Sequence, residues 1–116
     1  QKQTWHVVTE EIVPVNHGQI AREVKFLKEH TKSEVKVALP SPYLLGERMW
    51  DEELSKKAYP TKRDFTESLI PILRQELIAV RDEGVAIAQF DDPHLCLFVD
   101  SKIRSLYDDP EIEMRY

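Results

Sequence analysis

Residues 61–93 read TKRDFTESLIPILRQELIAVRDEGVAIAQFDDP and predict a long helix followed directly by a short buried strand. Apolar residues recur at spacings of four and three, the period of one helix face, at Phe65, Leu69, Leu73, Leu77 and Val80. Thr61 and Asp64 resemble a capping box, and Gly84 is typical of the position after a helix end. We therefore expect a helix over about Lys62–Glu83, bent at Pro71, and a strand over Ala86–Phe90.

The same helix and strand signals occur on both sides of this unit. Ile20, Val24 and Leu27 predict a helix from about Gly18 to His30, and an apolar strand follows over Val35–Leu39. Strand-forming residues predict an extended segment over residues 5–15, and residues 101–107 are expected to be helical. An alternation of three strands and three helices is typical of α/β proteins with a parallel sheet. The strands are almost continuously apolar, so we expect both faces of the sheet to be covered.

Length leaves two α/β architectures open. A chain of 116 residues suffices for one open, doubly wound domain. A (β/α)8 barrel takes about 250 residues, so this chain would be less than half of one. Residues 41–60 show no sustained period, and we expect a long loop there with at most one helical turn. Loops of this length inside a domain often serve a function.

The composition excludes several classes of partner. Sixteen Lys+Arg and 21 Asp+Glu give a net charge of −5 without a basic cluster, which argues against nucleic acids and anionic membrane surfaces. No apolar run approaches the roughly 20 residues of a membrane span, and no signal peptide is visible. The single cysteine, Cys96, cannot form an internal disulfide, so we expect a reducing, cytoplasmic location. Because the sequence does not begin with Met, we expect it to be part of a longer chain.

Asp91-Asp92-Pro93 is the most informative candidate site. These residues follow an apolar strand, and active sites of parallel α/β folds lie at the carboxyl ends of the strands. Adjacent strand residues point in opposite directions, so one carboxylate would face a ligand while the other braces the loop. The alternative is a solvated turn, because Asp-Asp-Pro is common in turns. Ser41 and Tyr43 follow the preceding strand, where they would either contact a ligand or form a rigid exit.

Other chemical motifs are weak. His94 and Cys96 have the spacing of half a zinc site, but catalytic zinc usually takes three protein ligands. Cys96 is equally well explained as a small buried apolar residue. The three glycines are isolated, which excludes phosphate-binding glycine motifs within these residues, and no GxSxG motif is present.

Four blocks of sequence together resemble a known family. They are residues 36–42 (KVALPSP), 58–60 (AYP), 74–77 (RQEL) with 83–84 (EG), and 88–95 (AQFDDPHL). In order and spacing they are similar to the catalytic barrel of the cobalamin-independent methionine synthases, and most similar to its short, single-barrel homologues. The resemblance covers nearly the whole span from Val35 to Asp100.

The resemblance implies a partial (β/α)8 barrel, with residues 1–116 forming one segment of about three strand–helix units. It implies an enzyme of methionine biosynthesis that transfers a methyl group from 5-methyltetrahydrofolate to homocysteine. Asp91 would hold the amino group of the substrate, and Asp92 stands where the family has Glu. With Ser41, chosen for its place after the preceding strand, they are the candidate substrate-binding residues. The family's zinc ligands would lie beyond residue 116, and His94-x-Cys96 is too close to Asp91 to be one of their pairs.

Two further expectations follow from this resemblance. The segment alone would be catalytically inactive, since it lacks the metal ligands. Its sheet edges would be covered by another chain, such as a second copy, or by the rest of a longer chain, because unpaired strand edges invite association. Two alternatives stay open: another barrel of the superfamily, such as a uroporphyrinogen decarboxylase-like or corrinoid-linked enzyme, or a non-catalytic α/β interaction module.

Overall fold

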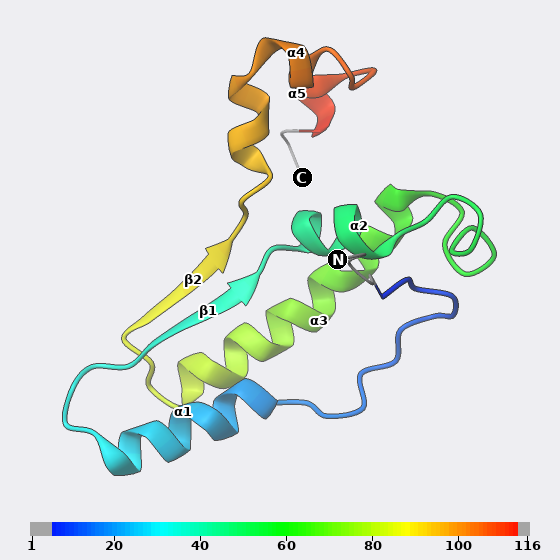
Figure 1. Cartoon of the computed structure of the whole chain (residues 1–116). Helices are drawn as coiled ribbons and strands as arrows, with labels where there is room; N and C mark the ends of the chain where they lie inside the picture. The colour runs from blue at the N-terminus through cyan, green and yellow to red at the C-terminus, as the bar shows by residue number, and fades with distance from the viewer. Residues whose placement is uncertain (1–5, 114–116) are drawn as a thin grey trace, which may run out of the picture.

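The computed structural model describes residues 6–113, which form a mixed α/β arrangement around a two-stranded sheet (Figure 1). In chain order the elements are α1 (Gln19–His30), β1 (Lys36–Pro40), α2 (Pro42–Met49), α3 (Lys62–Asp82), β2 (Ile87–Asp91), the 3-10 helix η1 (Leu95–Val99), α4 (Ser101–Arg104) and α5 (Pro110–Glu113). The α/β class is therefore confirmed. The described residues contain two strands where three were expected, and they do not form a barrel.

The two strands are parallel. The register pairs Lys36 with Ile87 at one end and Pro40 with Asp91 at the other. Figure 1 shows both arrows running the same way, toward the end of the sheet at which α2 begins. The hydrogen bond from the Ser41 amide to the Asp91 carbonyl, 3.0 Å long, continues this pairing past the last residue of β1. The carboxyl ends of β1 and β2 therefore lie side by side, as parallel pairing requires.

Helices α1 and α3 pack on one face of the sheet. Val24 of α1 and Val80 of α3 are completely buried in a cluster that includes Val35 and is flanked by Val37 of β1. On the opposite face, Ala38 and Gln89 are exposed. The expectation that both faces are covered is therefore wrong for the described residues, because helices from this part of the chain supply only one covering layer.

Helix α3 is the element that the sequence predicted most accurately. Thr61 and Asp64 form the expected capping box: the Thr61 hydroxyl accepts from the Asp64 amide at 3.1 Å, and the Asp64 carboxylate accepts from the Thr61 amide at 3.0 Å. The helix continues through Pro71 to Asp82, and Gly84 then takes a positive φ of 75°. Glycine adopts this left-handed conformation without the steric cost that a Cβ imposes.

Residues 41–60 differ from the predicted loop, because α2 makes up two turns of it. Ser41 caps this helix by accepting a hydrogen bond from the Leu44 amide at 2.9 Å, and Pro42 occupies the first helical position, where a missing N–H costs nothing. Gly46 lies so close to α3 that a Cβ there would stand 2.1 Å from the Thr66 hydroxyl. Gly46 thus permits the close packing of α2 on α3, whereas the sequence pattern predicted a loop at this position.

The segment from His6 to Val15 is not a strand, which corrects the prediction for residues 5–15; Trp5 lies outside the described residues. Its backbone is held instead by separate contacts with distant residues. The Val8 amide donates to the Met49 carbonyl at 2.9 Å, and the Ile12 amide donates to the Tyr59 hydroxyl at 2.8 Å. Val8 packs in a core with Tyr59, Phe65 and Leu69, so the segment covers α2 and α3 without joining the sheet.

The described residues after β2 form short helices. Residues 95–99 form the 3-10 helix η1, and α4 covers only Ser101–Arg104 of the helix expected over residues 101–107. Phe98 is buried between two aromatic rings, with its centroid 6.3 Å from that of Tyr43 and 4.9 Å from that of Tyr107. These rings attach the C-terminal part of the chain to the first turn of α2. Within residues 6–113, no helix has both the length and the apolar character needed to cross a membrane.

Candidate functional site

The carboxyl ends of β1 and β2 bring the sequence-predicted site residues together. Asp91 is the last residue of β2, and Ser41 follows the last residue of β1. Parallel pairing makes the Ser41 amide a donor to the Asp91 carbonyl, so two residues 50 positions apart become neighbours. Ser41, Asp91 and Asp92 therefore share the sheet edge at which ligands of parallel α/β proteins bind.

Asp91 lies on the open face of the sheet. It is exposed, and its Oδ1 accepts a hydrogen bond from Nε2 of Gln89, two residues earlier on the same face. Lys36 and Ala38 of β1 belong to this face too, and both are exposed. A carboxylate in this position can accept hydrogen bonds from an amine or a hydroxyl that approaches the uncovered face.

Asp92 takes the opposite direction, toward α2. Its Oδ2 accepts a hydrogen bond from the Ser41 hydroxyl at 2.8 Å. Its Oδ1 is buried and has no hydrogen-bond partner among the described residues. The carboxylate is joined through Ser41 to the first turn of α2, where the helix dipole favours negative charge.

Of the three predicted site residues, Asp91 alone is presented to the open face. Ser41 is 6% exposed, and its hydroxyl is used by both Leu44 and Asp92. Tyr43, considered above as a ligand contact, is 3% exposed and packs near Phe98. The structure thus separates one solvent-facing carboxylate from a buried group of polar side chains beneath it.

Gln89 is the site residue that sequence reasoning did not single out. Alternation along a strand places it on the same face as Asp91, since the two are separated by two positions. This alternation is visible in residues 88–93 (AQFDDP). The sequence does not show which face of the strand is open, because that depends on how the helices pack. A glutamine there limits the free rotation of the Asp91 side chain through their hydrogen bond.

The described residues do not fit a zinc ion. They contain no group of three or more His, Cys, Asp or Glu side chains arranged to hold a metal. Cys96 is exposed, and its thiol donates to the Pro93 carbonyl at 2.9 Å. No reaction step is therefore assigned to a metal held by residues 6–113.

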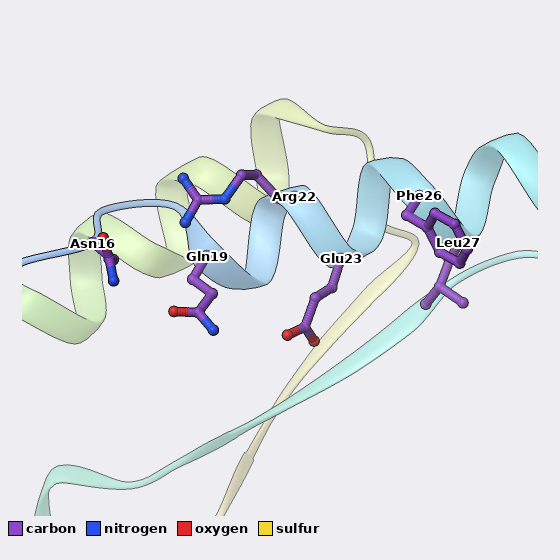
Figure 2. Close-up of a pocket in the computed structure, with 6 residues that line it drawn as sticks. All are labelled: Asn16, Gln19, Arg22, Glu23, Phe26 and Leu27. Carbon is purple, nitrogen blue, oxygen red and sulfur yellow. The ribbon is translucent and has the colours of Figure 1, made fainter.

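A separate hollow of about 620 Å³ lies along α1. It is lined by Asn16, Gln19, Arg22, Glu23, Phe26 and Leu27. Figure 2 shows Gln19, Glu23 and Leu27 in a row along one side of the helix. All six lining residues are exposed, so this hollow offers no desolvated polar group of the kind that selects a ligand.

Comparison of the chain with protein-family models, with curated proteins and with solved structures finds no match in any of the three.

Proposed function

We propose that this chain forms part of the catalytic barrel of a zinc-dependent methyltransferase that transfers a methyl group from 5-methyltetrahydrofolate to homocysteine, giving methionine. The observation that carries the proposal is the place of Asp91: it ends a parallel strand, on the uncovered face, at the edge where barrel enzymes bind substrate. The choice of this reaction rests on the sequence blocks over residues 36–95, which resemble this family.

In this proposal the chain's own contribution is recognition of an amino acid. Asp91 accepts hydrogen bonds from the substrate ammonium, a charge-assisted interaction stronger than a neutral hydrogen bond. Gln89 keeps the carboxylate directed over the open face by donating to Oδ1. Zinc, when bound by ligands supplied outside residues 6–113, would provide an activated thiolate at neutral pH.

The outer edge of β2 fits a place where the sheet continues. Ile87 and Phe90 are 56% and 44% exposed, which is high for apolar residues of a parallel strand. A groove between α3 and β2 is lined by Arg74, Leu77, Ile78, Arg81, Val85 and Ala88. In the proposal this edge is covered by further protein, either the rest of a barrel or a second copy, and the partners of the site itself are small molecules.

A binding experiment tests the proposal. The 15N-labelled chain is titrated with L-homocysteine, and its affinity is compared with that of Asp91→Asn. Asp91→Asn keeps an acceptor oxygen but removes the negative charge that faces the ammonium, and we expect binding to weaken by about 10- to 150-fold, the scale of the about 1.5–3 kcal/mol of a hydrogen bond to a charged group. Glu29→Gln removes the same charge from exposed α1 and serves as the control, with unchanged affinity expected. Absence of saturable binding, or equal affinity for Asp91→Asn, contradicts the proposal.

A further inference from the structure

Two hydrogen bonds from Ser41 hold the end of β2, one at the Asp91 carbonyl and one at the Asp92 side chain. Its amide donates to the Asp91 carbonyl at 3.0 Å, and its hydroxyl donates to Asp92 Oδ2 at 2.8 Å. The first bond holds the backbone at Asp91, and the second holds the side chain of the next residue. Together they determine how the end of β2 is oriented relative to β1.

The direction of the Ser41 hydroxyl is set by its surroundings. The oxygen accepts from the Leu44 amide at 2.9 Å, and its single proton is then donated to Asp92. A serine hydroxyl has one donor and two acceptor positions, so this arrangement uses the donor fully. Ser41 is only 6% exposed, so its hydroxyl and its bond with the Leu44 amide are shielded from water, whereas the bond to Asp92 is partly buried.

The same arrangement keeps Asp92 away from a ligand on the open face. The register ends with Pro40 beside Asp91, the Ser41 hydroxyl contacts Asp92 just beyond it, and neighbouring residues point to opposite faces. Asp92 is directed to Ser41 and α2, whereas Asp91 is directed to Gln89 and solvent. A single small ligand on the Asp91 side does not reach both carboxylates.

We infer that Ser41 and Asp92 are positioning residues, whose hydrogen bond holds the Asp91 carboxylate on the open face without contact between either residue and the ligand. This inference rests on the proposed function for the identity of the ligand. It differs from the expectation from the sequence, which made all three residues substrate-binding. It also assigns a reason for the partly buried hydroxyl–carboxylate pair at the end of the sheet.

The inference predicts that binding needs Asp92 as a hydrogen-bond acceptor and does not need its negative charge. Asp92→Asn keeps an oxygen that accepts from Ser41, so affinity for L-homocysteine stays within about twofold of the unmodified chain. Asp92→Ala and Ser41→Ala remove the hydrogen bond and weaken affinity by about 5- to 10-fold, less than the loss of a direct contact, because the bond orients Asp91 without itself touching the ligand. Ser41→Thr retains the hydroxyl and restores affinity. Asp91→Asn, by contrast, should weaken affinity whether or not Ser41 and Asp92 position Asp91, because that loss follows from the proposed function.

A ligand-free measurement keeps the two proposals distinguishable. Side-chain scalar couplings report the χ1 angle of Asp91, and we expect one dominant rotamer in the unmodified chain, Asp92→Asn and Ser41→Thr. Ser41→Ala and Asp92→Ala should show rotamer averaging. Val24→Ala, which destabilises the distant core, controls for general loosening and should leave the Asp91 rotamer unchanged.

Two outcomes overturn the inference. If Asp92→Asn loses as much affinity as Asp91→Asn, Asp92 contacts the ligand directly. If Ser41→Ala and Asp92→Ala leave the Asp91 couplings unchanged, the pair does not position Asp91. The second outcome decides the matter even if L-homocysteine does not bind, in which case the proposed function fails separately.

Discussion

Gly46 makes the packing of α2 on α3 sensitive to a single methyl group. In Gly46→Ala the new Cβ would stand 2.1 Å from the Thr66 hydroxyl oxygen and 3.3 Å from the Thr66 Cβ. Thr66 cannot easily turn away, because it is buried and its hydroxyl donates to the Lys62 carbonyl at 2.9 Å. The helices must therefore separate or the threonine must leave its rotamer.

The expected magnitude combines two opposing effects. Overpacking of this kind costs about 1–3 kcal/mol. Alanine gains about 1 kcal/mol over glycine inside a helix. Because a 2.1 Å approach to a held side chain is severe, the overpacking cost lies in the upper part of this range, and we expect Gly46→Ala to lower the free energy of unfolding by about 1–2 kcal/mol.

Urea unfolding followed by circular dichroism measures this change, and a double-mutant cycle identifies its cause. Thr66→Ala removes the hydroxyl that lies 2.1 Å from the new Cβ and leaves only the 3.3 Å contact. In that background, Gly46→Ala should cost less than about 0.5 kcal/mol or should stabilise the chain. A Gly46→Ala chain as stable as the unmodified one would refute the packing of α2 against α3.

Three other predictions concern the helix cap, the thiol and the chemistry. Thr61→Ala breaks the capping box of α3 and should lower the free energy of unfolding by about 1 kcal/mol in urea titration, whereas Thr61→Ser should cost little; equal loss in both would contradict the cap. Cys96→Ser should change stability by less than about 0.5 kcal/mol, because the thiol is exposed, and neither zinc nor a chelator should shift the melting temperature; a zinc-dependent shift lost in Cys96→Ser would show a metal site. The 116-residue chain incubated with zinc, 5-methyltetrahydrofolate and L-homocysteine should form no methionine by mass spectrometry; zinc-dependent turnover would show that this chain holds a complete active site.

Elements with a sustained apolar period were predictable from the sequence. Helices α1 and α3 lie within a residue or so of their expected bounds, and β1 and β2 are shifted by one. For these elements the local pattern agrees with the packing, since the periodic residues of α3, such as Phe65 and Val80, are the buried ones.

Elements that depend on distant residues were not predictable in the same way. Helix α2 has only eight residues and includes Gly46, whose purpose is visible only when Thr66 of α3 lies against it. The segment before α1 has strand-forming residues but pairs with no strand within residues 6–113, and its amides bond to Met49 and Tyr59. Propensity alone cannot supply a partner.

The candidate site was likewise predictable from the sequence only in part. Alternation along a strand predicted that Asp91 and Asp92 would have different roles, one facing a ligand and one bracing the chain. The partner of Asp92 was not identified, because the contact of Ser41 with Asp92 depends on the parallel register between strands 51 residues apart.

The central claim is that Asp91 binds the ammonium group of an amino acid at the carboxyl end of the sheet. It is tested most directly by titrating the 15N-labelled chain with L-homocysteine and, separately, with 4-mercaptobutanoate, which lacks only the amino group. The account predicts saturable shifts of the Gln89 and Asp91 amides with L-homocysteine, and binding by 4-mercaptobutanoate that is at least about tenfold weaker. Equal affinity for the two compounds, or shifts confined to α1, would contradict it.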